Sequence, residues 1–216
     1  MKRSLPTSTI KADTVLSYWL GDASTNPDKA REKKRLWYPS QKNQSQQTTD
    51  LAITDRFGVL FKDASAERLN LWRQHPRSTL ALVIVLDQFS RHIHRGTPRA
   101  FQQDPLALEI SAELTDHQGL SLLDRAFLYH PYKHVESLGA QAASVQLFKG
   151  LLSEADESWQ PMMSSFYRSA CQHQDIIKAY GRFPHRNEIL DRENTQAEQK
   201  FLASNGSTFG QRKRDD

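Results

Sequence analysis

Cysteine is nearly absent from this 216-residue chain, in which Cys171 stands alone. A single cysteine excludes both a disulfide within the chain and a zinc site built from several cysteines, and it fits a reducing compartment. The sequence also lacks an apolar run of about 18 residues, so we expect no membrane span. Asp13 interrupts the short apolar stretch behind the basic N-terminus, which therefore does not resemble a signal peptide. We expect a cytoplasmic protein.

Strand signals are also scarce, whereas apolar residues recur at intervals of three and four. This spacing predicts an all-α protein. Expected N-caps include Asp13, Asn26 and Asp104, and Thr195 forms a capping-box pattern with Glu198. The predicted helices, about nine to ten, cover roughly 13–20, 27–38, 50–62, 65–74, 79–93, 105–118, 121–130, 137–154, 161–180 and 195–203.

The length fits one domain, which we place at 13–203. Residues 1–12 precede it as an extension, and 204–216 follow as a loose tail. The polar stretch 39–50 is expected to form a surface loop. Short turns between successive helices predict antiparallel helix pairs, although no clean repeat appears.

The formal net charge of +4 favours acidic partners. The basic runs at 29–35 and in the tail have the composition of a solvated helix face and a frayed end. Aromatic residues are not interleaved with these runs as stacking platforms for RNA require. We therefore expect anionic metabolites as partners and do not expect nucleic acid.

A dense polar cluster follows the most apolar stretch of the chain. Every residue of 80–86 is apolar, which predicts a central, mostly buried helix. Asp87 and Arg91 are four residues apart, Arg95 repeats the interval, and Gln88 emerges at the same edge. One interpretation is a binding site. The other is a helix C-terminus with cations that suit its dipole and one intrahelical ion pair.

The turn after this helix offers a second possible anion site. Thr97 is expected to cap a helix from whose first turn Arg99 would project, next to Arg95. Alternatively, Arg99 pairs with a carboxylate of the following helix, such as Asp104 or Glu109.

Two further helix junctions are rich in polar groups. The stretch 126–148 carries His134, Glu136 and Gln141 between and along apolar helices. The stretch 173–190 turns at Gly181, and its turn contains several polar side chains: Arg182, His185, Arg186 and Asn187.

Motifs of metal and cofactor sites are missing. His92 and His94 diverge on a helix, Pro131 separates His130 from His134, and no HExxH pattern occurs. A GxSxG nucleophile motif, a glycine-rich phosphate loop and a dinucleotide fingerprint are absent as well. We expect neither a metal nor a cofactor.

Three stretches carry a family resemblance: "LDQFSRHIHRGTPRAFQQDPLAL", "FLYHPYKHVESLGAQ" and "IIKAYGRFPHRNEILDRENTQAEQKFL". They resemble the signature segments of the bacterial family termed domain of unknown function 924, over roughly 13–203. The resemblance implies a single-domain, tetratricopeptide-like right-handed superhelix and supplies no activity. The matching positions are Asp87, Gln88, Arg91, Arg95, Gly96, Phe101, His134, Glu136, Gln141, Arg182, His185, Arg186 and Asn187. Ser90, His92 and His94 depart from the pattern, which shows Pro, Asn and Phe there.

The leading hypothesis is that the three polar turns converge on a pocket for a small anionic ligand, a carboxylate or a phosphate. Three arginines would hold the anion, and other polar side chains would orient it. The expected binding residues are Gln88, Arg91, Arg95, Arg99, Gln141, Arg182 and Asn187. If the site is catalytic, His134 or His185 is the acid–base group and Glu136 or Asp87 orients it.

Two alternatives belong to other classes. Tetratricopeptide-like folds bind peptides, so the groove would clamp a peptide carboxylate without catalysis. In a purely structural alternative, Asp87, Arg91, His185 and Arg182 form a buried network, and breaking it would cost about 3–5 kcal/mol.

Overall fold

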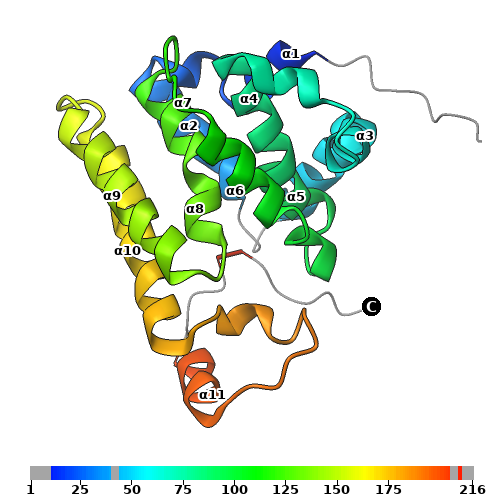
Figure 1. Ribbon diagram of the computed structural model, residues 1–216, viewed down its shortest axis with the longest axis vertical. Helices are drawn as coiled ribbons and strands as arrows, with labels where there is room; N and C mark the ends of the chain where they lie inside the picture. Colours follow the sequence, from blue (N-terminus) through cyan, green and yellow to red (C-terminus); the bar gives the residue numbers. More distant parts are fainter. Residues whose placement is uncertain (1–10, 40–43, 205–208, 211–216) are drawn as a thin grey trace, which may run out of the picture.

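The computed structural model describes residues 11–39, 44–204 and 209–210. Over these residues the regular structure is helical, with no strand, so the prediction of an all-α protein is confirmed (Figure 1). The α-helices are α1 (Ala12–Trp19), α2 (Pro27–Trp37), α3 (Ser45–Ser65), α4 (Pro76–Val83), α5 (Ser90–Ile93), α6 (Asp104–Glu113), α7 (Leu122–Leu128), α8 (His130–His134), α9 (Leu138–Glu154), α10 (Gln160–Tyr180) and α11 (Gln196–Ala203). Short 3-10 segments are η1 (Gly21–Ser24), η3 (Asn70–Gln74), η5 (Pro98–Ala100) and η6 (Pro184–Arg186), whereas η4 (Ile84–Phe89) is a π-helix.

The helices pack around one large hydrophobic core. Trp19, Phe57, Phe89 and Phe127 are fully buried at its centre. The ring centroids of Trp19 lie 5.5 Å from Phe89 and 5.9 Å from Phe127, in edge-to-face geometry that aromatic pairs favour. Helices α9 and α10 form a long hairpin beside this core (Figure 1). No helix in the described ranges has the length and apolar character needed to cross a membrane.

Helix ends agree with the sequence where a side chain caps its own helix. The Asn26 side chain accepts hydrogen bonds from the backbone N–H groups of Asp28 and Lys29, and Thr195 and Glu198 form the predicted capping box. The prediction was wrong for Asp104, because α6 begins at that residue after Gln103. Its carboxylate is buried in ion pairs and is not available as a cap.

Two other predicted boundaries also differ. Helix α3 begins at Ser45, so the second part of the expected loop 39–50 is helical, while 40–43 lie outside the described residues. Asp13 lies in the first turn of α1, behind Lys11 at the N-cap. The predicted helix over 65–74 is reduced to η3, because Glu67 adopts a left-handed backbone conformation with φ of 54°. The tetratricopeptide-like order of the helix pairs stays a prediction.

The central helix of the sequence analysis is α4, η4 and α5 in direct succession. Its apolar residues 80–86 are all buried, as predicted. The π-helical segment, however, was not expected. Short π-helical segments inside α-helices occur frequently at functional sites, and this one ends with Asp87, Gln88 and Phe89. The polar end of the central helix contacts α8, where Asp87 Oδ1 lies 2.6 Å from His134 Nδ1.

Candidate functional site

A cavity of about 280 Å³ lies between the polar end of the central helix and helices α2, α8 and α10. We call it the cationic pocket. Its lining residues are Lys34, Trp37, Tyr38, Gln88, Arg91, His92, Arg95, His130, Lys133, His134, Ser165, Phe166, Ser169, His173 and Phe209. None of these described lining residues has a carboxylate, whereas four of them are lysines or arginines.

Asp87 lies behind the wall of the pocket and orients two of its residues. His134 Nδ1 lies 2.6 Å from Asp87 Oδ1, and the Gln88 amide donates to Oδ2 at 2.5 Å. Asp87 is fully buried, yet its hydrogen bond with His134 and the charge of Arg91 outweigh this desolvation and hold its pKa well below the usual range. A permanently charged carboxylate therefore fixes the His134 ring.

Arg91 connects the pocket to a buried ion-pair network. One of its amino groups lies 3.3 Å from Asp87 and 2.7 Å from Asp104. Asp104 also pairs with Arg186 at 3.2 Å, and Arg186 donates to the backbone carbonyl of His134 at 2.7 Å. This network joins the central helix, α6, α8 and η6.

Arg95 is matched by a second buried carboxylate. Asp50, on α3, accepts from Arg95 Nε at 2.7 Å and from its amino group at 2.9 Å. His92 Nδ1 lies 2.8 Å from the same carboxylate. Partial desolvation raises the pKa of Asp50, but the hydrogen bonds with His92 and Arg95 and the charge of Arg95 outweigh it, so the net shift is downward. Both arginines of the pocket thus have acidic partners behind its wall.

The histidines of the pocket are neutral near neutral pH. Burial, followed by the charge of Arg91, lowers the pKa of His134 to about 3. Burial also lowers the pKa values of His92, His130 and His173. Because Asp87 stays charged, the neutral His134 ring must carry its proton on Nδ1. Its Nε2, which no described residue bonds, is then a hydrogen-bond acceptor.

Lys133 has no such acidic partner. The residue is 4% exposed, and its ammonium lies 5.4 Å from the Phe148 ring centroid and 5.8 Å from that of Phe166. Among the described residues the ammonium makes no hydrogen bond or ion pair. Burial, which the charge of Asp87 offsets in part, lowers the pKa of Lys133 to about 7.

The structure brings some of the predicted site residues together. Gln88, Arg91, Arg95 and His134 line the pocket, and Asp87 contacts His134 directly. The first two polar turns therefore converge, as the leading hypothesis required.

The third turn contributes less than expected. Arg182 makes a bidentate ion pair with Glu198 at 2.7 and 2.9 Å, and Asn187 bonds Asn194 and Arg192. Both lie outside the lining of the pocket, because these nearby polar groups already hold their side chains.

The remaining predicted residues of these turns also hold backbone or neighbouring side chains in place. Glu136 binds Arg192 at 2.7 Å, and the Gln141 amide donates to the carbonyls of Lys133 and Val135. His185 lies against Phe209, at 5.3 Å between ring centroids, and does not line the pocket.

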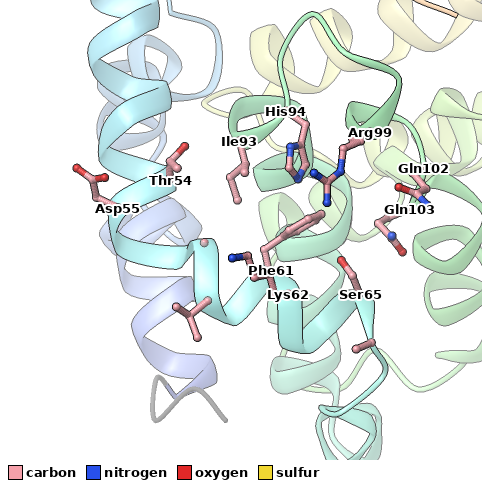
Figure 2. A pocket seen from close by; sticks show the side chains of 13 residues that line it. Thr54, Asp55, Phe61, Lys62, Ser65, Ile93, His94, Arg99, Gln102 and Gln103 are labelled. Atoms are coloured by element: carbon pink, nitrogen blue, oxygen red, sulfur yellow. The ribbon is translucent and has the colours of Figure 1, made fainter. Parts of the chain in front are cut away.

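Arg99 lines a different, larger cavity of about 670 Å³ between α3 and the segment after α5. Figure 2 shows Arg99, Gln102 and Gln103 on one side of it and Asp55 on α3 on the other. Thr97 lies at the predicted N-cap position of η5, but its hydroxyl donates to the carbonyl of His94 and caps no backbone N–H, and η5 has only three residues. Pairing of Arg99 with Asp104 or Glu109 is also wrong, because these acids bind Arg91, Arg186 and Arg73.

Sequence reasoning missed several pocket residues. Lys133 lies alone among aromatic and histidine residues in "FLYHPYKH", which is the available signal for a buried lysine. His173 lies seven residues after Phe166 and four before Ile177, on the buried face of α10. Phe209 has no local signal.

Part of the tail, which we expected to be loose, packs against the pocket. Phe209 stacks on His173 with ring centroids 3.8 Å apart, and the carbonyl of Gly210 accepts from Arg95 at 2.7 Å. These two residues are drawn in red near the end of α8 in Figure 1. Residues 205–208 and 211–216 of the predicted tail, and 1–10 of the predicted extension, lie outside the described residues.

Metal ligation is not suggested by the described part of the chain, where no group of three or more His, Cys, Asp or Glu residues could hold an ion. His92 faces Asp50, and His94 lies at the other cavity against Phe61, so this pair diverges.

The fold and the pocket together define an all-helical protein with a cationic cavity beside its core. The chain belongs to the bacterial proteins of unknown function grouped as DUF924, whose family pattern matches residues 15–206. The solved structure of ATU0120, a protein of unknown function from Agrobacterium tumefaciens, is similar to it. That protein is 32% identical, with a TM-score of 0.71 over 89% of this chain and 97% of the other. No curated protein matches the chain.

Proposed function

We propose that this protein binds a small anionic ligand, a carboxylate or a phosphate, in the cationic pocket. The observation that carries the proposal is the buried Lys133 ammonium, which has no acidic partner among the described residues, in a cavity whose described lining contains no carboxylate. An unpaired buried charge costs free energy, and an anion in the pocket would remove that cost.

The proposed ligand would interact first with Lys133. Arg91 and Arg95 also face the cavity, but their charges are matched by Asp87, Asp104 and Asp50. They would supply hydrogen bonds more than net charge. Gln88 would help to orient the ligand at the same edge.

The size of the pocket supports a small ligand over a peptide. A volume of about 280 Å³ lies just below the range of roughly 300–1,000 Å³ that is typical of small-molecule sites, so only a small ligand would fit. A peptide groove would be long and would repeat its contacts along several helices. The cavity is local, so the peptide alternative has less support.

Thermal denaturation of the full chain tests the proposal. The panel contains inorganic phosphate, pyruvate, succinate, phosphorylated sugars and a short peptide with a free carboxylate. A ligand at about 100 times its Kd should stabilise the native state by about 2.7 kcal/mol. The same ligand should stabilise Lys133→Met much less, and Lys149→Met, an exposed control on α9, as much as the unmodified chain. The absence of any anion effect, or equal effects in all three proteins, would contradict the proposal.

A further inference from the structure

Lys133 differs from a structural lysine in its surroundings. Lys29 and Lys178 are exposed and bind neighbouring side chains of their own helices, and Lys33 donates to the carbonyl of Tyr18. Lys133 instead holds its amine over two adjacent phenylalanine rings, Phe148 and Phe166, at the wall of a cavity. A methionine would fill this space without the cost of a buried charge, so packing alone does not account for the amine.

Such an environment favours the neutral, nucleophilic form of an amine. An ordinary lysine with a pKa near 10.4 is almost entirely protonated at pH 7. Burial lowers the pKa of Lys133 to about 7, so about half of its side chains are neutral at that pH. Desolvation in an apolar pocket is a recognised way to activate a lysine for attack on a carbonyl carbon.

The neighbouring side chains fit this chemistry. Arg91 and Arg95 line the same cavity and provide donors for a carboxylate or phosphate on the substrate. His134, which Asp87 orients through Nδ1, also lines the cavity and keeps Nε2 as an acceptor. The pocket therefore combines an amine, anion donors and a group able to carry a proton.

We propose that Lys133 forms a Schiff base with a small carbonyl compound that carries an anionic group, such as a 2-oxo acid. The neutral amine attacks the carbonyl carbon, a C–N bond forms, and the carbonyl π electrons move to oxygen. His134 Nε2 takes a proton from the nitrogen and passes it to this oxygen. Loss of the second nitrogen proton accompanies departure of the oxygen as water and leaves a C=N bond. This inference rests on the anion-binding function proposed above.

Reductive trapping tests the inference. The full chain is incubated near pH 7 with pyruvate or glyoxylate and cyanoborohydride, and the modified lysines are mapped by mass spectrometry. Lys133 should be alkylated at least about tenfold faster than exposed lysines such as Lys149, because about half of the Lys133 amine is neutral at this pH. The fast modification should be absent from Lys133→Arg, which keeps a positive charge, and should persist in Lys149→Met. His134→Gln, which removes the nitrogen proposed to carry the proton, should slow it.

The possible outcomes separate the two proposals. Selective trapping at Lys133 supports the Schiff base. Stabilisation by phosphate or carboxylates without selective trapping overturns the Schiff base and leaves the anion site. Labelling at the same rate on Lys133 and Lys149 also overturns it. If neither stabilisation by anions nor selective trapping is observed, both proposals are overturned.

Discussion

Two buried cations, Arg186 and Lys133, lie in similar surroundings and differ in one respect. Arg186 is 6% exposed and lies between the rings of Phe101 and Phe183, at 4.3 and 4.5 Å. Lys133 is 4% exposed and lies near two phenylalanine rings at 5.4 and 5.8 Å. Arg186, however, pairs with the Asp104 carboxylate and the carbonyl of His134, whereas no described residue pairs with Lys133.

The difference separates a structural charge from a functional one. A buried ion pair whose partners are present holds helices together, and removal of one partner leaves an uncompensated charge. A buried cation without a partner lowers stability in the absence of a ligand. We therefore assign Arg186 to the scaffold and Lys133 to the site, and the variants below test this division.

The largest effect is expected for Arg186→Met. The change leaves Asp104 with Arg91 alone and removes the hydrogen bond to the carbonyl of His134. We expect the free energy of unfolding to fall by about 3 kcal/mol, measured by urea denaturation. Arg99→Met, at an exposed arginine, is the control and should change stability by less than about 0.5 kcal/mol. Equal effects would contradict the scaffold role of Arg186.

Lys133→Met should change the free energy of unfolding in the opposite direction. Removal of an unpaired buried ammonium, with its volume largely kept, should raise the free energy of unfolding by about 1–3 kcal/mol near neutral pH. The same denaturation experiment measures it, with Lys149→Met as the control. A loss of stability would show that the ammonium has a partner and would remove the main support for the anion site.

The gain from Lys133→Met should depend on pH. The pKa of Lys133 is about 7 in the native state and near 10.4 in the unfolded chain, so the unfolded chain binds more protons between these values. The stability of the unmodified chain therefore rises with pH relative to Lys133→Met. The gap between the two should be largest below pH 7 and narrow up to about pH 10. The charged and titratable groups that face Lys133 are Asp87, Arg91, His130, His134 and His173.

None of these facing groups titrates between pH 7 and 10, since burial keeps the histidines neutral and the Asp87–Arg91 pair stays charged. The pH dependence of the stability difference between the two proteins therefore reports the titration of Lys133. Denaturation curves of both proteins across this pH range measure it. A gap that stays constant with pH would mean that the amine remains as fully charged in the native state as in the unfolded chain, and it would contradict the lowered pKa of Lys133.

The smallest effect is expected for Arg182→Ala. Arg182, whose side chain is 29% exposed, pairs with Glu198 at the start of α11, and ion pairs with an exposed partner contribute little to stability. The stabilisation by anions should stay unchanged, because Arg182 does not line the pocket. Thermal denaturation with and without phosphate tests both points. A lost phosphate effect would extend the site to the third polar turn.

Features that depend on neighbours in the chain could be predicted from the sequence. The Asn26 cap, the capping box at Thr195 and the Asp87–Arg91 pair all involve residues at most four positions apart. Burial of residues 80–86 follows from their composition. Even here the π-helical segment was unexpected, and nothing in the local sequence marks it.

Predictions that depended on distant residues succeeded only in part. Arg182 and Asn187 are residue types typical of a binding site, but in the structure their side chains bind residues of 192–198. Conversely, Lys133 was not selected, since its importance lies in having no acidic partner among the described residues that surround it. Phe209 reaches the pocket from the far end of the chain.

The sequence by itself determined that this protein is helical, where most helices begin and end, and which polar turns carry titratable groups, because capping and periodicity are local. The tertiary structure decided which charges are neutralised and which face the cavity. The energy of a buried charge depends on the partners that folding brings within a few ångströms. Asp104 and Arg186 are 82 positions apart and still form an ion pair, so separation along the chain does not decide which partners meet.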